Sequence, residues 1–240
     1  MNLVIWAAAA IGGSTLLGTG CGFLLEKVSE KMNDFSVAFA GGVMLSAAVF
    51  GLFVPAMDMA QGWNCAAVLL GAVCGVLFLR VIYVFSRKMG GGSLLGSHPE
   101  LMFVVAIAVH KFPEGMAGGV GLCGMDPAAS VLVPLGVALQ NLPEGAVMIP
   151  PMIAAGMKKS RAALIALATG LLNAAGVFAG ALWGRLSGII LPFALSFAGG
   201  AMLDVILFQM VPQVSASRFR GKTAVLTGGF LLMAAVNMLF

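Results

Sequence analysis

Long apolar runs are the feature that most constrains this chain. A helix needs about 20 apolar residues to cross the hydrocarbon layer of a bilayer, and eight runs of this kind follow one another with short connections between them. The runs are Leu3–Leu25, Phe35–Ala60, Asn64–Phe85, Leu101–Cys123, Ala128–Met157, Ala162–Leu186, Ile189–Val211 and Thr223–Phe240. The sequence therefore predicts an all-α membrane protein with eight transmembrane helices, in which residues 1–240 form a single transmembrane domain.

The scarcity of charge excludes the other broad classes of protein. Charged residues make up 9% of the chain and hydrophobic residues 60%, whereas a globular protein carries about 25% charged residues. So few charges cannot cover a water-soluble domain of 240 residues, and such an apolar chain does not stay disordered. Because the chain has a single tyrosine and no basic run, we expect it to lie in a lipid bilayer and not to bind nucleic acid.

Lysines and arginines are distributed unequally between the two sides of the expected bundle. If the N-terminus lies outside, ten of them fall in cytoplasmic connections and one, Arg185, falls outside. The ten are Lys27, Lys31, Arg87, Lys88, Lys158, Lys159, Arg161, Arg218, Arg220 and Lys222. Because cytoplasmic loops are enriched in Lys and Arg, both termini are expected to be extracytoplasmic. The compactness of the chain favours the plasma (inner) membrane of a prokaryote.

An internal repeat links the second and seventh spans. The segment Phe39–Leu45 reads FAGGVML, and Phe197–Leu203 reads FAGGAML; a Val-Pro pair follows each, at Val54-Pro55 and Val211-Pro212. Five crossings separate the copies, so they run in opposite directions through the bilayer. This pattern predicts an inverted repeat of helices 1–3 and 6–8 around a central pair, an architecture of secondary transporters. The alternative is chance recurrence of small residues that pack transmembrane helices.

Polar side chains lie midway along the fourth and fifth spans, where hydrocarbon is expected. They are His110, Lys111 and Glu114 in the fourth span, and Gln140, Asn141 and Glu144 in the fifth, with Pro113 and Pro143 directly before the acids. A charged side chain at the centre of a membrane helix costs about 2.5–3.5 kcal/mol on insertion scales. Position alone therefore makes these residues a candidate functional site.

The spacing of these residues indicates a metal site. His110 and Glu114 are four residues apart and share one face of a helix, and Gln140 and Glu144 repeat this geometry. Together they offer an imidazole nitrogen, an amide oxygen and two carboxylates, a mixed set suited to a divalent ion such as zinc or iron(II). The alternative for His110 is a hydrogen bond within the bundle, which the doubled polar-x-x-Pro-Glu-Gly pattern disfavours.

These paired motifs resemble those of the ZIP (Zrt/Irt-like) divalent metal transporters, and the resemblance covers essentially the whole chain. It implies a homodimeric carrier, without catalysis or prosthetic group, that moves zinc, and often iron, manganese or cadmium, into the cytoplasm. By motif, His110, Glu114, Gln140 and Glu144 match the primary metal ligands. Met44 resembles a thioether contributor to that site, with core packing as the alternative.

The chain departs from the family pattern at a second metal site. Many family members build that site from Asn or Asp directly after each first ligand and from an acid on the sixth span. Here Lys111 follows His110 and Asn173 takes the position on the sixth span, so only Asn141 remains compatible. Lys111 lies three residues before Glu114, where its ammonium can pair with the shared carboxylates. We therefore expect one bound ion rather than two.

Two further acids have open roles. Asp58, at the outer end of the second span, resembles an entrance carboxylate; the alternative is an acid at a solvated helix end. Asp204, two residues after Met202, is expected to act as a proton relay or an additional metal ligand, or to make a hydrogen bond between helices.

Two other functions also remain open. A membrane-embedded zinc enzyme is disfavoured because the chain lacks HExxH and a third histidine ligand, and a non-transporting metal sensor would keep the same ligands.

Overall fold

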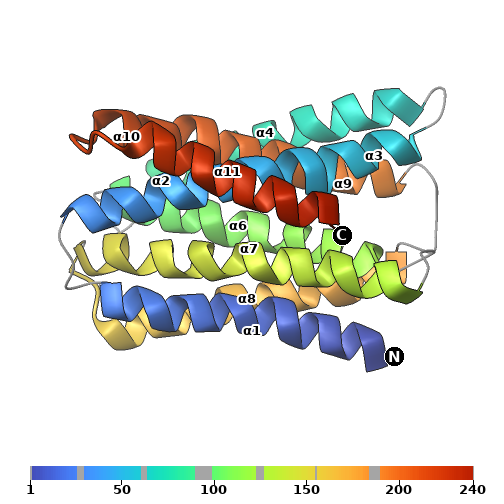
Figure 1. Ribbon diagram of the computed structural model, residues 1–240, viewed down its shortest axis with the longest axis horizontal. Coiled ribbons are helices and arrows are strands. Elements are labelled where there is room, and N and C mark those ends of the chain that lie inside the picture. The colour runs from blue at the N-terminus through green and yellow to red at the C-terminus, as the bar shows by residue number, and fades with distance from the viewer. Residues whose placement is uncertain are drawn as a thin grey trace.

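The computed structural model describes residues 2–25, 30–60, 64–89, 99–122, 127–154, 156–183 and 190–239. Within these ranges the chain forms eight helical rods that lie side by side (Figure 1). The rods are α1 (Asn2–Leu25), α2 (Glu30–Ser46) continued by η1 (Ala47–Phe53) and α3 (Val54–Met59), α4 (Asn64–Met89), α6 (Pro99–Val120), α7 (Pro127–Ala154), α8 (Lys159–Trp183), α9 (Ile190–Val205) continued by η2 (Ile206–Met210) and α10 (Val211–Ala216), and α11 (Lys222–Leu239). The prediction of an all-α protein with eight long helices is confirmed.

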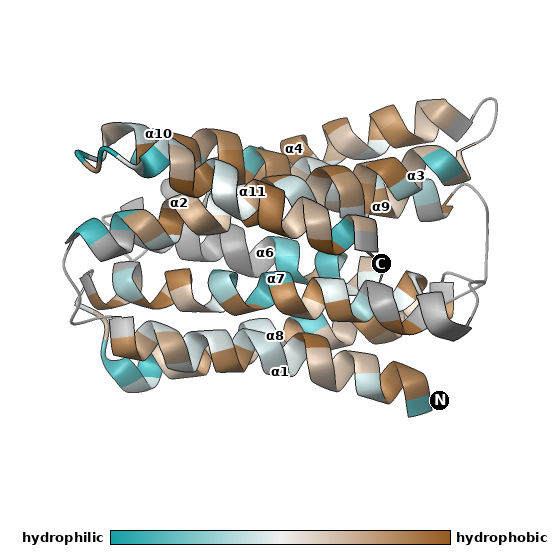
Figure 2. Cartoon of the chain, in the orientation of Figure 1, coloured by the Kyte–Doolittle hydropathy of each residue, from teal (hydrophilic) through white to brown (hydrophobic). Residues whose placement is uncertain are grey.

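The outer surface of the bundle is apolar. Within the described residues, five helical stretches are long and apolar enough to cross a membrane, and Lys222–Met238 forms a shorter apolar helix. The five are Asn2–Leu24, Asp34–Met59, Cys65–Val84, Lys159–Leu182 and Pro192–Ala216. Large side chains such as Leu17, Leu69 and Leu182 point outward, and hydrophobic residues dominate the rods along their length (Figure 2). The chain is a multi-pass membrane protein.

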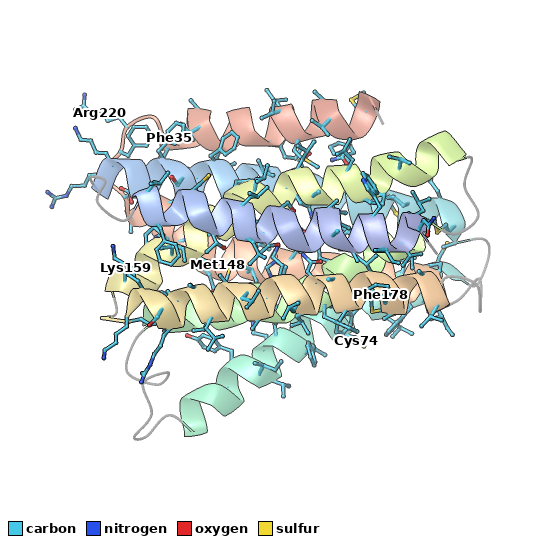
Figure 3. The ribbon with its side chains drawn as sticks, turned by 90° about the horizontal axis from the view of Figure 1, so that it is seen from below. Phe35, Cys74, Met148, Lys159, Phe178 and Arg220 are labelled. Atoms are coloured by element: carbon cyan, nitrogen blue, oxygen red, sulfur yellow. The ribbon has the colours of Figure 1, made fainter. Side chains whose placement is uncertain are left out.

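The two ends of the bundle differ in charge. Both termini lie toward the same end (Figure 1), whereas Lys159 and Arg220 point away from the bundle at the opposite end (Figure 3). We call these the terminal end and the basic end. The helices thus separate the termini from basic side chains in the way that the Lys and Arg count predicts.

Several rods extend beyond the apolar runs that predicted them, the second and seventh by the most. The second begins at Glu30 instead of Phe35, and the seventh continues past Val211 to Ala216. Helical hydrogen bonding does not stop where the hydrocarbon ends, because water accommodates the polar residues of a protruding turn. Pro212 lies at the junction where the π-helical segment η2 passes into α10, and the seventh rod continues through it.

The packing follows the inverted repeat. Helix α2 packs on α11 as α9 packs on α4, and α1 packs on α7 as α8 packs on α6. A Cβ added to Gly42 would collide with the carbonyl of Leu226 in α11, and one added to Gly200 would collide with that of Ala72 in α4. The repeated glycines therefore have the same role in both copies. The π-helical segments η1 and η2 also occupy equivalent places, each ending directly before a Val-Pro pair.

The rods form two groups that meet along the site-bearing helices. One group contains α1, α6, α7 and α8; the other contains the α2, α4, α9 and α11 rods (Figure 1). The groups touch mainly where α6 meets α9 and where α7 meets α2. These two contacts are equivalent under the repeat, and they place the polar motifs of α6 and α7 at the boundary between the groups.

Candidate metal site

The structure brings the two polar motifs together in the core of the bundle. His110, Lys111 and Glu114 lie on α6, and their side chains are buried against those of Gln140, Asn141 and Glu144 on α7. His110, Glu114 and Glu144 each offer one ligand atom, and these three atoms lie within 4.8 Å of one another. This spacing is close to what an ion with metal–ligand distances of about 2.0–2.2 Å needs.

The glycine after each acid decides how the two helices are rotated. A Cβ at Gly115 would collide with the carbonyl oxygen of Asn173 in α8, and a Cβ at Gly145 with that of Thr15 in α1. Each glycine therefore lets its helix press its backbone against a neighbour on the outer side. Glu114 and Glu144, one position earlier, are turned toward each other.

Lys111 is bound into the centre of the site. Its Nζ lies 2.7 Å from Glu114 Oε2 and also contacts Glu144 Oε2 and Asn141 Oδ1. An ammonium has three donors, so each of its hydrogens has an acceptor. The pairing of Lys111 with both carboxylates, which the sequence suggested, is present in the structure.

The other polar atoms of the site leave one carboxylate oxygen for an ion. Gln140 donates through Nε2 to Glu114 Oε1, and His110 Nε2 lies 3.7 Å from Glu144 Oε2. Among the described residues, Glu144 Oε1 is buried with no hydrogen-bond donor in reach. A buried oxygen without a partner is costly, and a divalent cation would satisfy it. A half-turn of the Gln140 amide would present its oxygen to the same ion.

Met44 and Asp58 lie in different surroundings. Met44, on α2, is fully buried in the apolar cluster that also contains Met148 and Met202. Asp58, on α3, is exposed at the terminal end of the bundle. Asp58 is therefore not part of the buried group, and its role as an entrance carboxylate stays a prediction.

Asp204 is engaged away from the polar motifs. Its Oδ1 lies 2.6 Å from Nε of Arg80, and the Arg80 guanidinium lies 3.5 Å from the centre of the Phe208 ring. The pair joins α9 to α4, which agrees with the helix–helix interpretation of Asp204. Sequence reasoning did not pair Asp204 with Arg80, although an arginine inside an apolar run was a signal that it needs a partner.

A cavity connects the site to the terminal end. It has a volume of about 210 Å³, and its lining includes Glu114 and Gln140 as well as Met59, Gly121 and Asn237. The last three lie where the α3, α6 and α11 rods reach the terminal end. The site is therefore approached from the side on which the termini lie.

On the side of the basic end, apolar side chains pack beside the site. Met148 and Met152 follow Glu144 on α7 at successive four-residue intervals, so they continue its face of the helix, and both are fully buried. They belong to a packed apolar cluster with Met202 and Met210. Among the described residues, the site thus adjoins a cavity on the side of the terminal end and packed methionines on the side of the basic end.

An inverted repeat of membrane helices around a buried imidazole–carboxylate cluster defines a multi-pass membrane protein of the transporter class. The chain belongs to the ZIP zinc transporter family, whose model matches residues 86–237.

Relatives named as zinc transporters match the chain over most of its length. It is 34% identical to zinc transporter GufA of Myxococcus xanthus, with 99% of each chain covered. It is 32% identical to zinc transporter ZIPB of Bordetella bronchiseptica, with 95% of this chain and 76% of that protein covered. Zinc transporter ZupT of Chlorobaculum parvum is 26% identical, with 95% and 94% covered.

Proposed function

We propose that this protein takes up divalent transition metal ions, Zn²⁺ foremost and iron, manganese or cadmium as alternatives, across the plasma (inner) membrane into the cytoplasm. One ion binds at a time, with His110, Glu114, Gln140 and Glu144 as ligands and Met44 as a thioether contributor. The observation that carries the proposal is a buried His–Glu–Glu cluster that a cavity joins to the terminal end of the bundle. The names of the relatives support zinc as the substrate.

The ion enters from the terminal end, which we assign to the extracytoplasmic side because the basic side chains lie at the opposite end. On arrival it takes the oxygen of Glu144 that lacks a donor and displaces the Gln140–Glu114 hydrogen bond. The ligands must be deprotonated to bind, so protons compete with the metal.

Release requires the path toward the basic end to open. The inverted repeat gives a reason why a state open toward the terminal end and a state open toward the basic end are close in energy. Exchanging the conformations of the two repeat halves reverses the direction in which the site is exposed. We propose that α6 and α7 rock against α2 and α9, the elements that they meet at the boundary between the two groups. The resemblance to the family supports a homodimer as the working unit.

Uptake of radioactive zinc into proteoliposomes tests this function. The wild type accumulates zinc, whereas Glu144→Ala abolishes accumulation and Gln140→Ala reduces it strongly, because each removes a donor atom. Gln213→Ala is the matched control, since Gln213 is an exposed amide on α10, and its uptake should equal that of the wild type. Near-normal uptake by Glu144→Ala at equal protein density would contradict the proposal, and a wild type without flux would favour a sensor or an enzyme.

A further inference from the structure

A buried cation at the centre of a cation site needs an explanation that the proposed ligand set does not give. Lys111 is fully buried, and its ammonium contacts the carboxylates of both Glu114 and Glu144. It therefore opposes the binding of the ion that the two acids attract. Packing alone would be met by an uncharged side chain of the same length.

The lysine is held in this place by a second layer of contacts. Asn141 accepts a hydrogen bond from Lys111 through Oδ1 and donates one through Nδ2 to the carbonyl of Ile11 in α1, at 3.2 Å. The backbone of α1 thus fixes the orientation of the amide, and the amide fixes the ammonium. Lys111 is anchored to α7 and α1 as well as to the acids.

The charge of the site shows what the lysine changes. With both glutamates ionised, the histidine neutral and Lys111 protonated, the empty site carries a net charge of −1 and becomes +1 with a dication. Without Lys111 the same site would carry −2 when empty and 0 when loaded. The lysine makes the two states equal in the magnitude of their charge.

This equality matters when the site is closed to both sides. The cost of moving a charge from water into protein of low dielectric grows with the square of the charge, as in the Born expression. Reducing the empty site from −2 to −1 therefore lowers its cost about fourfold, while the loaded site becomes costlier. A carrier that performs net uptake must close around the empty site once in every cycle, whereas one that only exchanges ions never does.

We propose that Lys111 is a tethered counter-ion that lets the metal-free site pass through the closed state, so that the protein performs net uptake and not merely exchange of one bound ion for another. This inference rests on the proposed function, and it assigns to Lys111 a role in the return half of the cycle.

Two flux modes in proteoliposomes separate the half-cycles. Net uptake is followed as radioactive zinc entering metal-free vesicles, and exchange as radioactive zinc entering vesicles that contain unlabelled zinc. For the wild type the two rates should agree within about threefold. Lys111→Met, which keeps the length and removes the charge, should lower net uptake by about tenfold or more while exchange stays within about threefold of the wild type. Lys111→Arg retains the charge and should restore net uptake relative to Lys111→Met.

Each outcome bears on the inference. A wild type that exchanges zinc more than about tenfold faster than it takes it up overturns the role of Lys111, and this result needs no variant to fold. The role is also overturned if Lys111→Met, eluting as a monodisperse protein that binds zinc, loses net uptake and exchange to the same extent or retains both. It is overturned as well if Lys111→Arg shows the same fluxes as Lys111→Met. Absence of flux in both modes of the wild type refutes the proposed function itself and is thereby distinguishable.

Discussion

The two partners of the Arg80–Asp204 ion pair should contribute unequally to stability, because they differ in what each can do when left alone. The Asp204 side chain is 6% exposed and that of Arg80 is 39% exposed. Arg80 lies nine residues before the end of α4, roughly 14 Å along the axis from the basic end of that helix. Its long side chain can turn toward the lipid headgroups, whereas the short Asp204 side chain stays between α9 and α4.

The expected free energies follow from this difference. Arg80→Met leaves an unpaired carboxylate in the core, for which we expect a loss of about 3–5 kcal/mol. Asp204→Asn leaves an arginine that keeps the Phe208 ring beneath it and can reach the interface, so the loss should be about 1 kcal/mol. The double variant removes both charges and should recover to within about 1 kcal/mol of the wild type.

Thermal unfolding of the detergent-solubilised variants, followed by size-exclusion chromatography, measures these losses. At about 2–4 °C per kcal/mol for a chain of this size, Arg80→Met should unfold at least about 6 °C below the wild type. Asp204→Asn should transport zinc at a near-normal rate. Equal losses for the two single variants, or a double variant whose loss is their sum, would refute the reasoning from burial. Folded Asp204→Asn protein without flux would show that Asp204 is a ligand or proton relay.

Three other measurements examine the site. Purified wild type should bind one zinc ion per chain and Lys111→Asn should bind two, because the ammonium then no longer fills the space beside the carboxylates. Elemental analysis after desalting counts the bound zinc ions, and one ion in both proteins would disprove this role of the lysine. Gly115→Ala should lower the unfolding temperature by pushing α6 away from the Asn173 carbonyl, whereas Gly20→Ala, with open space around its Cβ, should leave it unchanged or raise it slightly; equal effects would count against close packing at Gly115. Gly136 lies in the cavity wall, so a membrane-impermeant thiol reagent applied from the extracytoplasmic side should block uptake by the Gly136→Cys variant. Inhibition only from the cytoplasmic side would reverse the assigned orientation.

Much of the architecture was predictable because the bilayer restricts what a chain can do. The apolar runs indicated eight helices, and their ends differ from the observed ones mainly where α2 and α10 protrude beyond the hydrocarbon. The repeated FAGG segments indicated the inverted repeat, since close helix packing demands glycine at the same place in both copies. The residue pattern did not predict the π-helical segments η1 and η2, because they depend on how each rod packs against its neighbours.

The polar motifs were equally visible in one dimension, since a buried His, Lys or Glu in an apolar run stands out against its surroundings. Spacing alone showed that His110 shares a face with Glu114, but it left open whether the two motifs face each other. Packing of Gly115 and Gly145 against neighbouring backbones settles that rotation. The partner of Asp204 was likewise out of reach, because Arg80 is 124 residues away in the chain.

What the amino-acid order determined by itself is therefore local: which segments enter lipid, which of their residues oppose that environment, and at what helical spacing. Which side chains of different helices touch is decided only by the tertiary structure, because these contacts depend on the rotation and depth of each helix relative to several others at once. That packing places three acceptors around the Lys111 ammonium, pairs Asp204 with Arg80 and joins the polar cluster to the terminal end of the bundle through a cavity.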